Sequence, residues 1–337
     1  MLITGGAGFF GQLLVHELLE AGLEVRSLDV LPLEDGELRG AVDHRLGDVR
    51  DPEAVGQAVQ GCEVVVHNAA LVPVTRARRD FFTVNVDGTR VVLDVARREG
   101  VRHAVHISSS AVYGTSSELP ITEDTPAAPV EAYGRSKAEA DRVARAVATE
   151  GLPLTIMRPR TLVGPGRLGL FELVFDWIRT GRPVFILGRG DNRYQLLASA
   201  DFARACLLAV QRAPGGEFNI GSAEYTTPRQ DLQAVIDHAG SRSRIRSVPP
   251  ALARAVLHPL YLLRLSPLVP WHYLSQHHPF YFDTTRARER LGFVAAVSNR
   301  EMLIEAYDGQ RAHQGATGSA HRRPLRRGVL RVLRGKR

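Results

Sequence analysis

The amino-acid sequence predicts an α/β protein, in which a doubly wound parallel sheet is followed by a smaller, mostly C-terminal α/β part. Short apolar runs alternate with amphipathic stretches along residues 1–157. The runs are apolar at consecutive positions, which is typical of strands buried on both faces and so of a parallel sheet covered by helices. A glycine-rich turn follows the first run directly, as it does where such a strand leads into a helix.

The expected elements follow one another in alternation. The predicted strands are MLIT at 1–4, LEVRSLD at 23–29, CEVVVHN at 62–68, HAVHISSS at 103–110 and LPLTIM at 152–157. Amphipathic spacing predicts the helices between them, over 9–21, 80–99 and 131–150. Further along, we expect helices near 168–180, 200–212, 228–239 and 251–264, and a strand near 196–200 that joins the first sheet.

These patterns divide the chain into three parts. Residues 1–157 form the sheet domain, residues 158–310 form mainly the substrate-binding part, and residues 311–337 form a basic tail that we expect to be flexible. The chain has 43 Lys and Arg against 36 Asp and Glu, but residues 311–337 hold nine of the basic residues and none of the acidic ones. Residues 1–310 are therefore slightly acidic, which argues against nucleic-acid binding by this part.

The cysteines and histidines show no metal-binding pattern. Cys62 and Cys206 stand in apolar surroundings, so we expect reduced thiols and a cytoplasmic setting. The histidines near the C-terminal end of the substrate part have no partners at metal-ligand spacing, so no metal is expected; they are His272, His277 and His278.

No targeting or membrane-spanning segment is expected. The chain opens directly on a strand, which leaves no room for a signal peptide. The apolar stretch 251–271 is interrupted by two arginines, a histidine and three prolines, so it should not cross a membrane. We favour a buried helix there; a lid over a pocket and a helix lying on a membrane are the alternatives.

The glycine-rich turn TGGAGFFG predicts a dinucleotide site on a Rossmann-type sheet. Gly5, Gly8 and Gly11 allow a tight turn and a close approach of the backbone to a pyrophosphate, which then lies at the positive end of the helix. Asp29 ends the second strand, where a carboxylate can accept hydrogen bonds from ribose hydroxyls. The following VLPLE offers no Lys or Arg for a 2′-phosphate, which favours NAD over NADP. An ordinary tight loop and an ordinary exposed Asp are the alternatives.

Tyr133 and Lys137 form a candidate catalytic pair. They stand four residues apart on an expected helix, so both project from one face. A free tyrosine, with a pKa of about 10, needs a nearby cation to act as a base at neutral pH. Lysine supplies a compact charge that arginine cannot imitate. Lys137 and Lys336 are the only lysines in this arginine-rich chain, which favours a specific role for Lys137 over that of a solvated helix residue.

The chain resembles the extended short-chain dehydrogenase/reductases of the NAD-dependent epimerase/dehydratase family, and the nucleotide-sugar epimerases among them, along roughly residues 1–310. The resemblance is carried by the glycine turn, by Asp29 and by six further segments in the family's order. These are GDVRD at 47–51, HNAA at 67–70, NVDGT at 85–89, SSSAVYG at 108–114, YGRSK at 133–137 and RPRTLVGPG at 158–166.

The resemblance implies a role for individual residues. Tyr133 would be the acid/base, Lys137 its electrostatic partner, and Ser109 would orient the reacting hydroxyl. The implied cofactor contacts are Gly5, Gly8, Phe9, Phe10, Gly11, Asp29, Asp48, Val49, Ala69, Ala70, Asn85, Tyr133, Lys137 and Pro159. The implied substrate contacts are Ser109, Ser110, Thr161 and Arg193. Ordinary turn or strand-end positions are the alternatives for Asn85 and for the serines at 108–110.

The same resemblance narrows the set of reactions that we expect the protein to catalyse. Family members that eliminate water carry acidic residues in the two places after the serine, where this chain has Ser110 and Ala111. Reversible oxidation without elimination therefore remains, either as epimerisation through a transient ketone or as net dehydrogenation. We expect an NAD-dependent nucleotide-sugar epimerase of carbohydrate metabolism, an isomerase, acting as a homodimer.

Two other functions stay open. Thr161 replaces an Asn that nucleotide-sugar enzymes carry. The aromatic, apolar stretch 270–283 is expected to pack against the sheet domain, but it could instead line an apolar substrate site, as in a 3β-hydroxysteroid dehydrogenase-like oxidoreductase. Arg193 argues the other way, because an arginine at this place binds the diphosphate in similar sugar-nucleotide enzymes. A non-catalytic NAD-sensing protein is the third reading.

The tail after GATGSA interleaves Arg with Leu and Val. A solvated, flexible tail is the default expectation. Contact with an acidic membrane surface or with RNA is the alternative.

Overall fold

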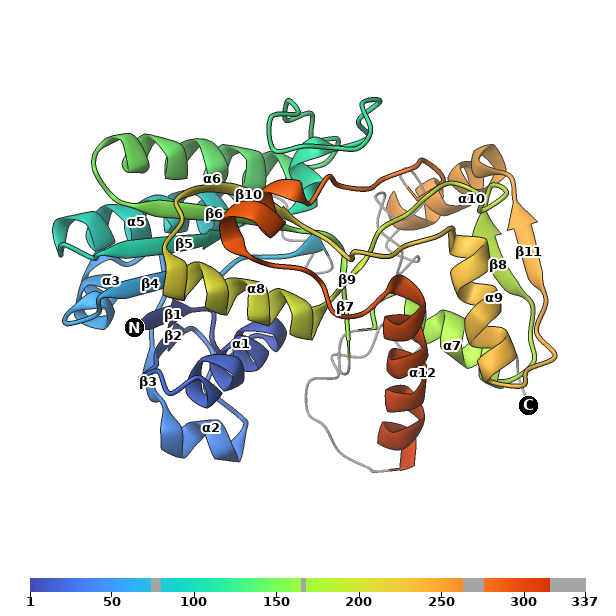
Figure 1. The fold of residues 1–337 in the computed structure, drawn as a ribbon, viewed down its shortest axis with the longest axis horizontal. Coiled ribbons are helices and arrows are strands. Elements are labelled where there is room, and N and C mark those ends of the chain that lie inside the picture. Colours follow the sequence, from blue (N-terminus) through green and yellow to red (C-terminus); the bar gives the residue numbers. More distant parts are fainter. Residues whose placement is uncertain (74–79, 165–167, 263–275, 316–337) are drawn as a thin grey trace. The chain divides into compact units, whose positions relative to one another are not determined.

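The computed structural model describes residues 1–73, 80–164, 168–262 and 276–315, and these form two compact units. Unit 1 comprises Met1–Leu162, Gln195–Glu224 and Tyr281–Ser298. Unit 2 comprises the described residues within Val163–Tyr194, Tyr225–Phe280 and 299–315. The first segment of unit 1 ends close to the expected boundary at residue 157, but two later segments of the chain return to it (Figure 1).

Unit 1 is built on a seven-stranded sheet in which every neighbouring pair of strands is parallel. The order is β10-β6-β5-β4-β1-β2-β3, so the direction of winding reverses between β1 and β4, as in a doubly wound Rossmann sheet. The strands are β1 (Leu2–Thr4), β2 (Arg26–Asp29), β3 (Asp43–Leu46), β4 (Val64–His67), β5 (His103–Ile107), β6 (Leu154–Pro159) and β10 (Gly216–Ile220). The predicted fold class is confirmed.

Helices cover both faces of this sheet (Figure 1). They are α1 (Phe9–Glu20), α2 (Gly36–Ala41), α3 (Pro52–Val59), α4 (Asp80–Phe82), α5 (Gly88–Arg98), α6 (Ala132–Thr149) and α8 (Ser199–Arg212). The apolar faces of α1 and α8 pack with one side of the strands, and those of α3, α5 and α6 pack with the other. The continuous strand runs identified in the sequence are buried for this reason.

Three expectations for unit 1 need correction. The later strand in the main sheet is β10, whereas the strand expected near 196–200, β9 (Leu197–Ala198), pairs with β7 (Leu162–Val163) in a separate sheet. The helix expected over 80–99 is interrupted by a π-helical turn, Thr83–Asp87, between α4 and α5. Strand β3 escaped prediction because its sequence, DHRL, is polar and lies at the sheet edge.

Unit 2 combines a small parallel sheet with helices. Its strands are β8 (Val184–Leu187) and β11 (Ile245–Val248), and its helices are α7 (Phe171–Arg179), α9 (Pro228–His238), α10 (Pro250–Leu262) and α12 (Asn299–Gly315). Helix α12 continues through residues 311–315, so the expected tail cannot begin at residue 311. The rest of that tail, 316–337, lies outside the described residues.

Two further sequence expectations concern thiols and membranes. Cys206 is buried, Cys62 is half-buried, and both are free thiols. Within the described ranges, no helix has the length and apolar character needed to cross a membrane.

Candidate active site

The glycine-rich turn is shaped by close backbone contacts. Gly5 has φ +73°, a left-handed conformation, and a Cβ there would lie 2.7 Å from the Cα of Ala69. A Cβ on Gly11 would lie 2.0 Å from the carbonyl oxygen of Gly5. At Gly8 the nearest atom would be 3.3 Å away, so packing within the chain constrains Gly8 less than its neighbours. The turn thus forms a cradle whose open point is Gly8.

Helix α1 begins at this open point. Its N-cap, Gly8, gives no side-chain hydrogen bond to the first-turn N–H groups. These groups and the helix dipole favour an anion, so the cradle and the helix end together suit a pyrophosphate. The side chain of Phe10 lies in the core, stacked on Phe202 at 4.7 Å, so only the backbone of Phe10 can face a ligand.

Asp29 links the glycine turn to the segment after β2. One carboxylate oxygen accepts the N–H of Ala7 and the other accepts the N–H of Leu31, both at 3.0 Å. Asp29 remains partly exposed at the carboxyl end of β2. Its remaining lone pairs can therefore accept hydrogen bonds from the hydroxyl groups of a ribose, the role predicted for it.

Tyr133 and Lys137 both lie on α6, whose first turn is capped by Glu131 accepting the N–H of Gly134 at 3.2 Å. Tyr133 is half-buried, and its ring meets Phe81 edge-on with centroids 6.1 Å apart. The Nζ of Lys137 donates to the carbonyl oxygen of Ile107 at 2.8 Å. This bond holds the lysine against the end of β5, one turn along the helix from Tyr133.

Lys137 is a buried cation, with only 3% of its surface exposed. Burial lowers the pKa of this ammonium from 10.5 to about 8, while the charge of Asp141 opposes the shift. Its other two N–H bonds have no acceptor in the part of the chain that the structure describes. They are available to a ligand beside Tyr133.

Ser109 and Ser110 follow β5 but face different surroundings. The Oγ of Ser109 accepts the N–H of Ala111 at 3.2 Å, which leaves its hydroxyl hydrogen able to donate. Ser110 is buried, and its Oγ accepts a hydrogen bond from Nη1 of Arg160 at 3.2 Å. Both hydroxyls thus keep a hydrogen to donate, but Ser109 is only partly buried whereas Ser110 is buried, so Ser109 is the serine that a ligand can reach.

A chain of buried hydrogen bonds connects the strand before the glycine turn to α6. The N–H of Ala69 donates to Thr4 Oγ1 at 3.2 Å, and Thr4 Oγ1 meets Nδ1 of His67 at 2.8 Å. Nε2 of His67 meets Thr89 Oγ1 at 3.0 Å, and that hydroxyl donates to the carbonyl of Asn85 at 2.6 Å. Since Thr89 uses its hydrogen on Asn85, His67 must donate from Nε2 and accept at Nδ1.

Asn85 completes this connection. Its amide donates to Ser136 Oγ at 3.0 Å, and Ser136 donates to the carbonyl of Tyr133 at 2.8 Å. The same side chain accepts the N–H of Leu71 and donates to its carbonyl. Burial, together with the charges of His106 and Lys137, lowers the pKa of His67 well below its usual value, so it is neutral as the chain of bonds requires.

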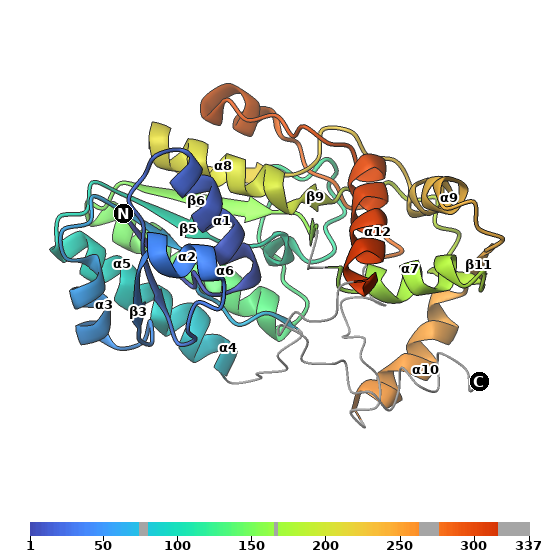
Figure 2. The ribbon, with the colours of Figure 1, turned by 90° about the horizontal axis from the view of Figure 1, so that it is seen from below.

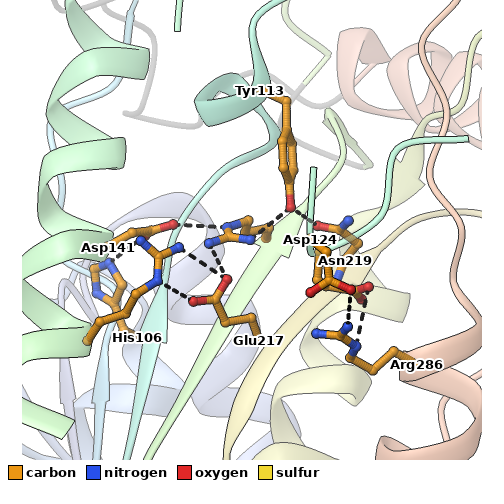
Figure 3. A network of polar contacts seen from close by, with 10 residues as sticks. His106, Tyr113, Asp124, Asp141, Glu217, Asn219 and Arg286 are labelled. Carbon is orange, nitrogen blue, oxygen red and sulfur yellow. Dashed lines mark hydrogen bonds and ion pairs between the residues drawn. The ribbon is translucent and has the colours of Figure 1, made fainter. Parts of the chain in front are cut away.

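A second buried network, which includes Asp141 of α6, holds this helix to the sheet (Figure 3). Nε of Arg158 donates to Asp141 at 2.9 Å, its Nη1 donates to Tyr113 Oη at 2.8 Å, and its Nη2 lies 2.6 Å from Glu217. His106 Nε2 lies 3.5 Å from Asp141. Burial would raise the pKa of Asp141, but His106 and Arg158 hold it well below the usual range, so the carboxylate is charged.

The remaining predicted residues are distributed over both units. In unit 1, Asp48 is paired with Arg50 at 2.6 Å, Val49 and Pro159 are buried, Ala70 is half-buried, and Thr161 is exposed. In unit 2, Arg193 is exposed, with its guanidinium 4.9 Å from the ring centre of Tyr225. Residues 1–162 therefore supply every predicted catalytic and cofactor residue.

Sequence reasoning missed the residues that hold the candidate site in place. His67, Thr89 and Ser136 act through hydrogen bonds to backbone and side chains, and Asp141 pairs with Arg158 inside the protein. One signal was present: Asp141 stands four residues after Lys137, on the same helix face. The described residues contain no group of three or more His, Cys, Asp or Glu able to hold a metal ion.

A family model and known proteins are similar to this chain. The model of the NAD dependent epimerase/dehydratase family matches residues 1–221. An uncharacterized protein of Sinorhizobium fredii is 38% identical, over 98% of this chain and 85% of its own length. Sterol demethylase protein B of Methylococcus capsulatus is 30% identical, over 90% of this chain and 96% of its own length.

Solved structures are similar over nearly the whole chain. The UDP-glucose 4-epimerase of Thermotoga maritima, solved with UDP-glucose, matches with a TM-score of 0.76 and 25% identity, over 93% of this chain and 99% of that one. MoeE5, solved with UDP-glucuronic acid and NAD, matches with a TM-score of 0.75 and 26% identity over the same shares.

Proposed function

Because the chain belongs to the NAD-dependent epimerase/dehydratase family, we propose that it is an enzyme that moves a hydride at a secondary alcohol carbon, with Tyr133 as acid/base. The observation that carries this proposal is the buried ammonium of Lys137, fixed to the Ile107 carbonyl one helical turn from Tyr133. A buried cation with free donors beside a tyrosine is suited to stabilising a phenolate.

The residues of unit 1 fit the cofactor NAD. The cradle at Gly5, Gly8 and Gly11 with the N-terminus of α1 would hold the pyrophosphate, and Asp29 would hold the adenosine ribose. Lys137 would bind the second ribose with its remaining N–H groups. When bound, NAD supplies the hydride acceptor and donor for the reaction.

The proton is handled by the chain itself. Tyr133 would take the hydroxyl proton of the substrate as its carbinol carbon is oxidised, and Ser109 would orient that hydroxyl by donating a hydrogen bond. The charge of Lys137 stabilises the phenolate form of Tyr133 before the proton arrives. When the ketone is reduced, Tyr133 returns the proton.

Elimination of water is not part of the proposed reaction. That step needs an acid beyond Tyr133, yet Ser110 is buried and bonded to Arg160, and Ala111 has no functional group. Epimerisation and net dehydrogenation both remain consistent with the site.

A nucleotide sugar is the first candidate substrate. Its support is the similarity over nearly the whole chain to a UDP-glucose 4-epimerase solved with UDP-glucose. Arg193 supports it as well, because its guanidinium is exposed and suited to a diphosphate. On this reading the enzyme is an epimerase and forms no net NADH.

An apolar secondary alcohol is the second candidate. Thr161, where similar nucleotide-sugar enzymes carry Asn, is exposed and lacks the amide. A relative at 30% identity is named for a sterol. On this reading the enzyme is a 3β-hydroxysteroid dehydrogenase-like oxidoreductase.

The assay that tests the proposal uses the full chain with NAD and either UDP-glucose or a 3β-hydroxysteroid. Formation of the epimeric UDP-sugar without net NADH supports the epimerase, and stoichiometric NADH with the steroid supports the dehydrogenase. In either case Tyr133→Phe should lower kcat by about 10²–10⁴-fold, because it removes the acid/base, and should leave NAD affinity nearly unchanged. Full turnover by Tyr133→Phe would refute the proposed role.

A further inference from the structure

Helix α10 in unit 2 has three distinct faces. Ala253, Leu257 and Leu260, spaced i, i+4 and i+7, are its more buried residues. A second face at the same spacing carries Leu252, Ala255, Val256 and Pro259, all exposed and apolar, and the third carries Arg254 and His258. A helix packed only into its own domain needs one apolar face, whereas α10 has two.

The second apolar face is openly accessible. Leu252 is 55% exposed and Val256 is 51% exposed. Figure 2 shows α10 projecting away from α9 and α12 of the same unit. Two large apolar side chains one turn apart on an exposed helix indicate a surface that meets an apolar environment.

The neighbouring strands carry further exposed apolar and basic side chains. Phe185 of β8 is 52% exposed and is the ladder partner of Arg246 in β11. Arg244 and Arg246 are both exposed and stand two residues apart, so their side chains leave the same face of the strand. The chain passes from β11 to α10 within two residues, and the first residue of α10, Pro250, lies beside Gly188 at the end of β8.

The charged residues of β11 and α10 all have one sign. No Asp or Glu occurs between Asp237 and Asp283, a stretch that contains the whole of β11 and α10. The side chains of Arg244, Arg246 and Arg254 form no ion pair within the described part of the chain. An exposed apolar helix face combined with a polar face and a neighbouring strand that carry cations and no acids is the pattern of a helix that lies in the interface of an anionic membrane.

We propose that this surface docks unit 2 on an anionic lipid bilayer. Its residues, named here the α10 surface, are Phe185, Arg244, Arg246, Leu252, Arg254 and Val256. Leu252 and Val256 enter the boundary between headgroups and acyl chains, and the arginines contact lipid phosphates. The binding is peripheral, because α10 runs only from Pro250 to Leu262.

This inference does not depend on the proposed reaction. It uses no residue of the catalytic or cofactor set, and lipid binding can be measured without turnover. It bears on the substrate, because a docked enzyme can take an apolar alcohol from the bilayer.

The test is flotation of the full chain with vesicles of phosphatidylcholine alone or of phosphatidylcholine mixed with phosphatidylglycerol. We expect binding to the mixed vesicles, weaker binding at high salt and little binding to phosphatidylcholine. The double variant Leu252→Glu and Val256→Glu should lose binding by tenfold or more. Each of Arg246→Gln and Arg254→Gln should weaken binding about fivefold, since one basic residue near an anionic surface contributes about that factor.

Control variants distinguish the α10 surface from the basic tail and from a contact between two copies of the chain. Val294, an equally exposed apolar residue of unit 1, provides the matched variant Val294→Glu, which should bind like the parent. Binding that is lost on deleting residues 316–337 but kept in the α10 double variant would overturn the proposal, because the tail alone would then be responsible. A change of oligomeric state in the double variant, with vesicle binding intact, would overturn it in favour of contact with a second copy. Absence of any binding to anionic vesicles by the parent would overturn it as well.

Discussion

The two units differ in the environment of their charged side chains. In unit 1, Lys137, Asp141 and Arg158 are buried and each has fixed partners at hydrogen-bond distance. In unit 2, Arg246 and Arg254 are exposed and unpaired among the described residues. A buried charge is stable only with matched partners, so the residues that surround it in the fold are constrained, whereas an exposed charge tolerates many neighbours. The proposed catalytic residues of unit 1 can therefore be recognised from sequence motifs. The proposed lipid-binding surface of unit 2 is marked only by its residue composition.

The largest effect is expected at the buried ion pair of Asp141 and Arg158. Asp141→Asn removes the carboxylate that faces Arg158 and His106 and leaves the guanidinium with less compensation in a buried site. We expect the free energy of unfolding to fall by about 3–5 kcal/mol, measured by urea denaturation.

The same substitution in unit 2 is the matched control. Asp191 pairs with Arg189, and both side chains are mostly exposed. Asp191→Asn should change the free energy of unfolding by less than about 0.5 kcal/mol. Equal losses in the two variants would contradict the contrast between the units.

The next effect comes from the buried ammonium. Because burial lowers the pKa of Lys137 to about 8, the folded chain releases this proton before the unfolded chain does, whose lysine titrates near 10.5. Between these values the unfolded state binds more protons, so the free energy of unfolding rises with pH. Below pH 8 the folded chain carries the full free-energy cost of burying the charged ammonium. Across this interval the gain is about 3 kcal/mol.

Lys137→Met lacks this titration and so isolates it. The difference in unfolding free energy between the parent and Lys137→Met should increase with pH from about 8 to 10.5. A difference that stays constant over this range would show that the ammonium is not desolvated in the folded chain.

Local features of the candidate site could be predicted from the sequence, whereas features that depend on the tertiary fold could not. The glycine turn, Asp29 and the Tyr133 and Lys137 pair could be predicted because local spacing places these groups on one turn or one helix face. The connection from Thr4 through His67 to Ser136 could not, since it joins residues far apart in the chain whose meeting depends on the sheet order. The exposed face of α10 could not either: its apolar pattern alone favours a buried helix, and exposure is decided by what packs beside it.

A smaller effect tests the cofactor cradle. In Gly11→Ala the new Cβ would lie 2.0 Å from the Gly5 carbonyl oxygen, so the backbone of the turn must move. We expect NAD affinity, measured by calorimetric titration, to fall at least about 100-fold, or about 2.7 kcal/mol. Gly56→Ala in α3 is the control, because a Cβ there meets no atom within 4 Å. It should leave NAD affinity unchanged and add about 0.5–1 kcal/mol of stability.

The smallest expected effect tests the exposed surface of unit 2. Leu252→Ser removes an apolar side chain that is 55% exposed, so the free energy of unfolding should change by less than about 0.5 kcal/mol. In unit 1, Leu14→Ala removes a fully buried side chain and should cost about 2–5 kcal/mol. Thermal and urea unfolding of both variants measure the contrast. A loss above about 2 kcal/mol for Leu252→Ser would mean that this face of α10 is packed within the folded protein, and it could not then be free for a bilayer.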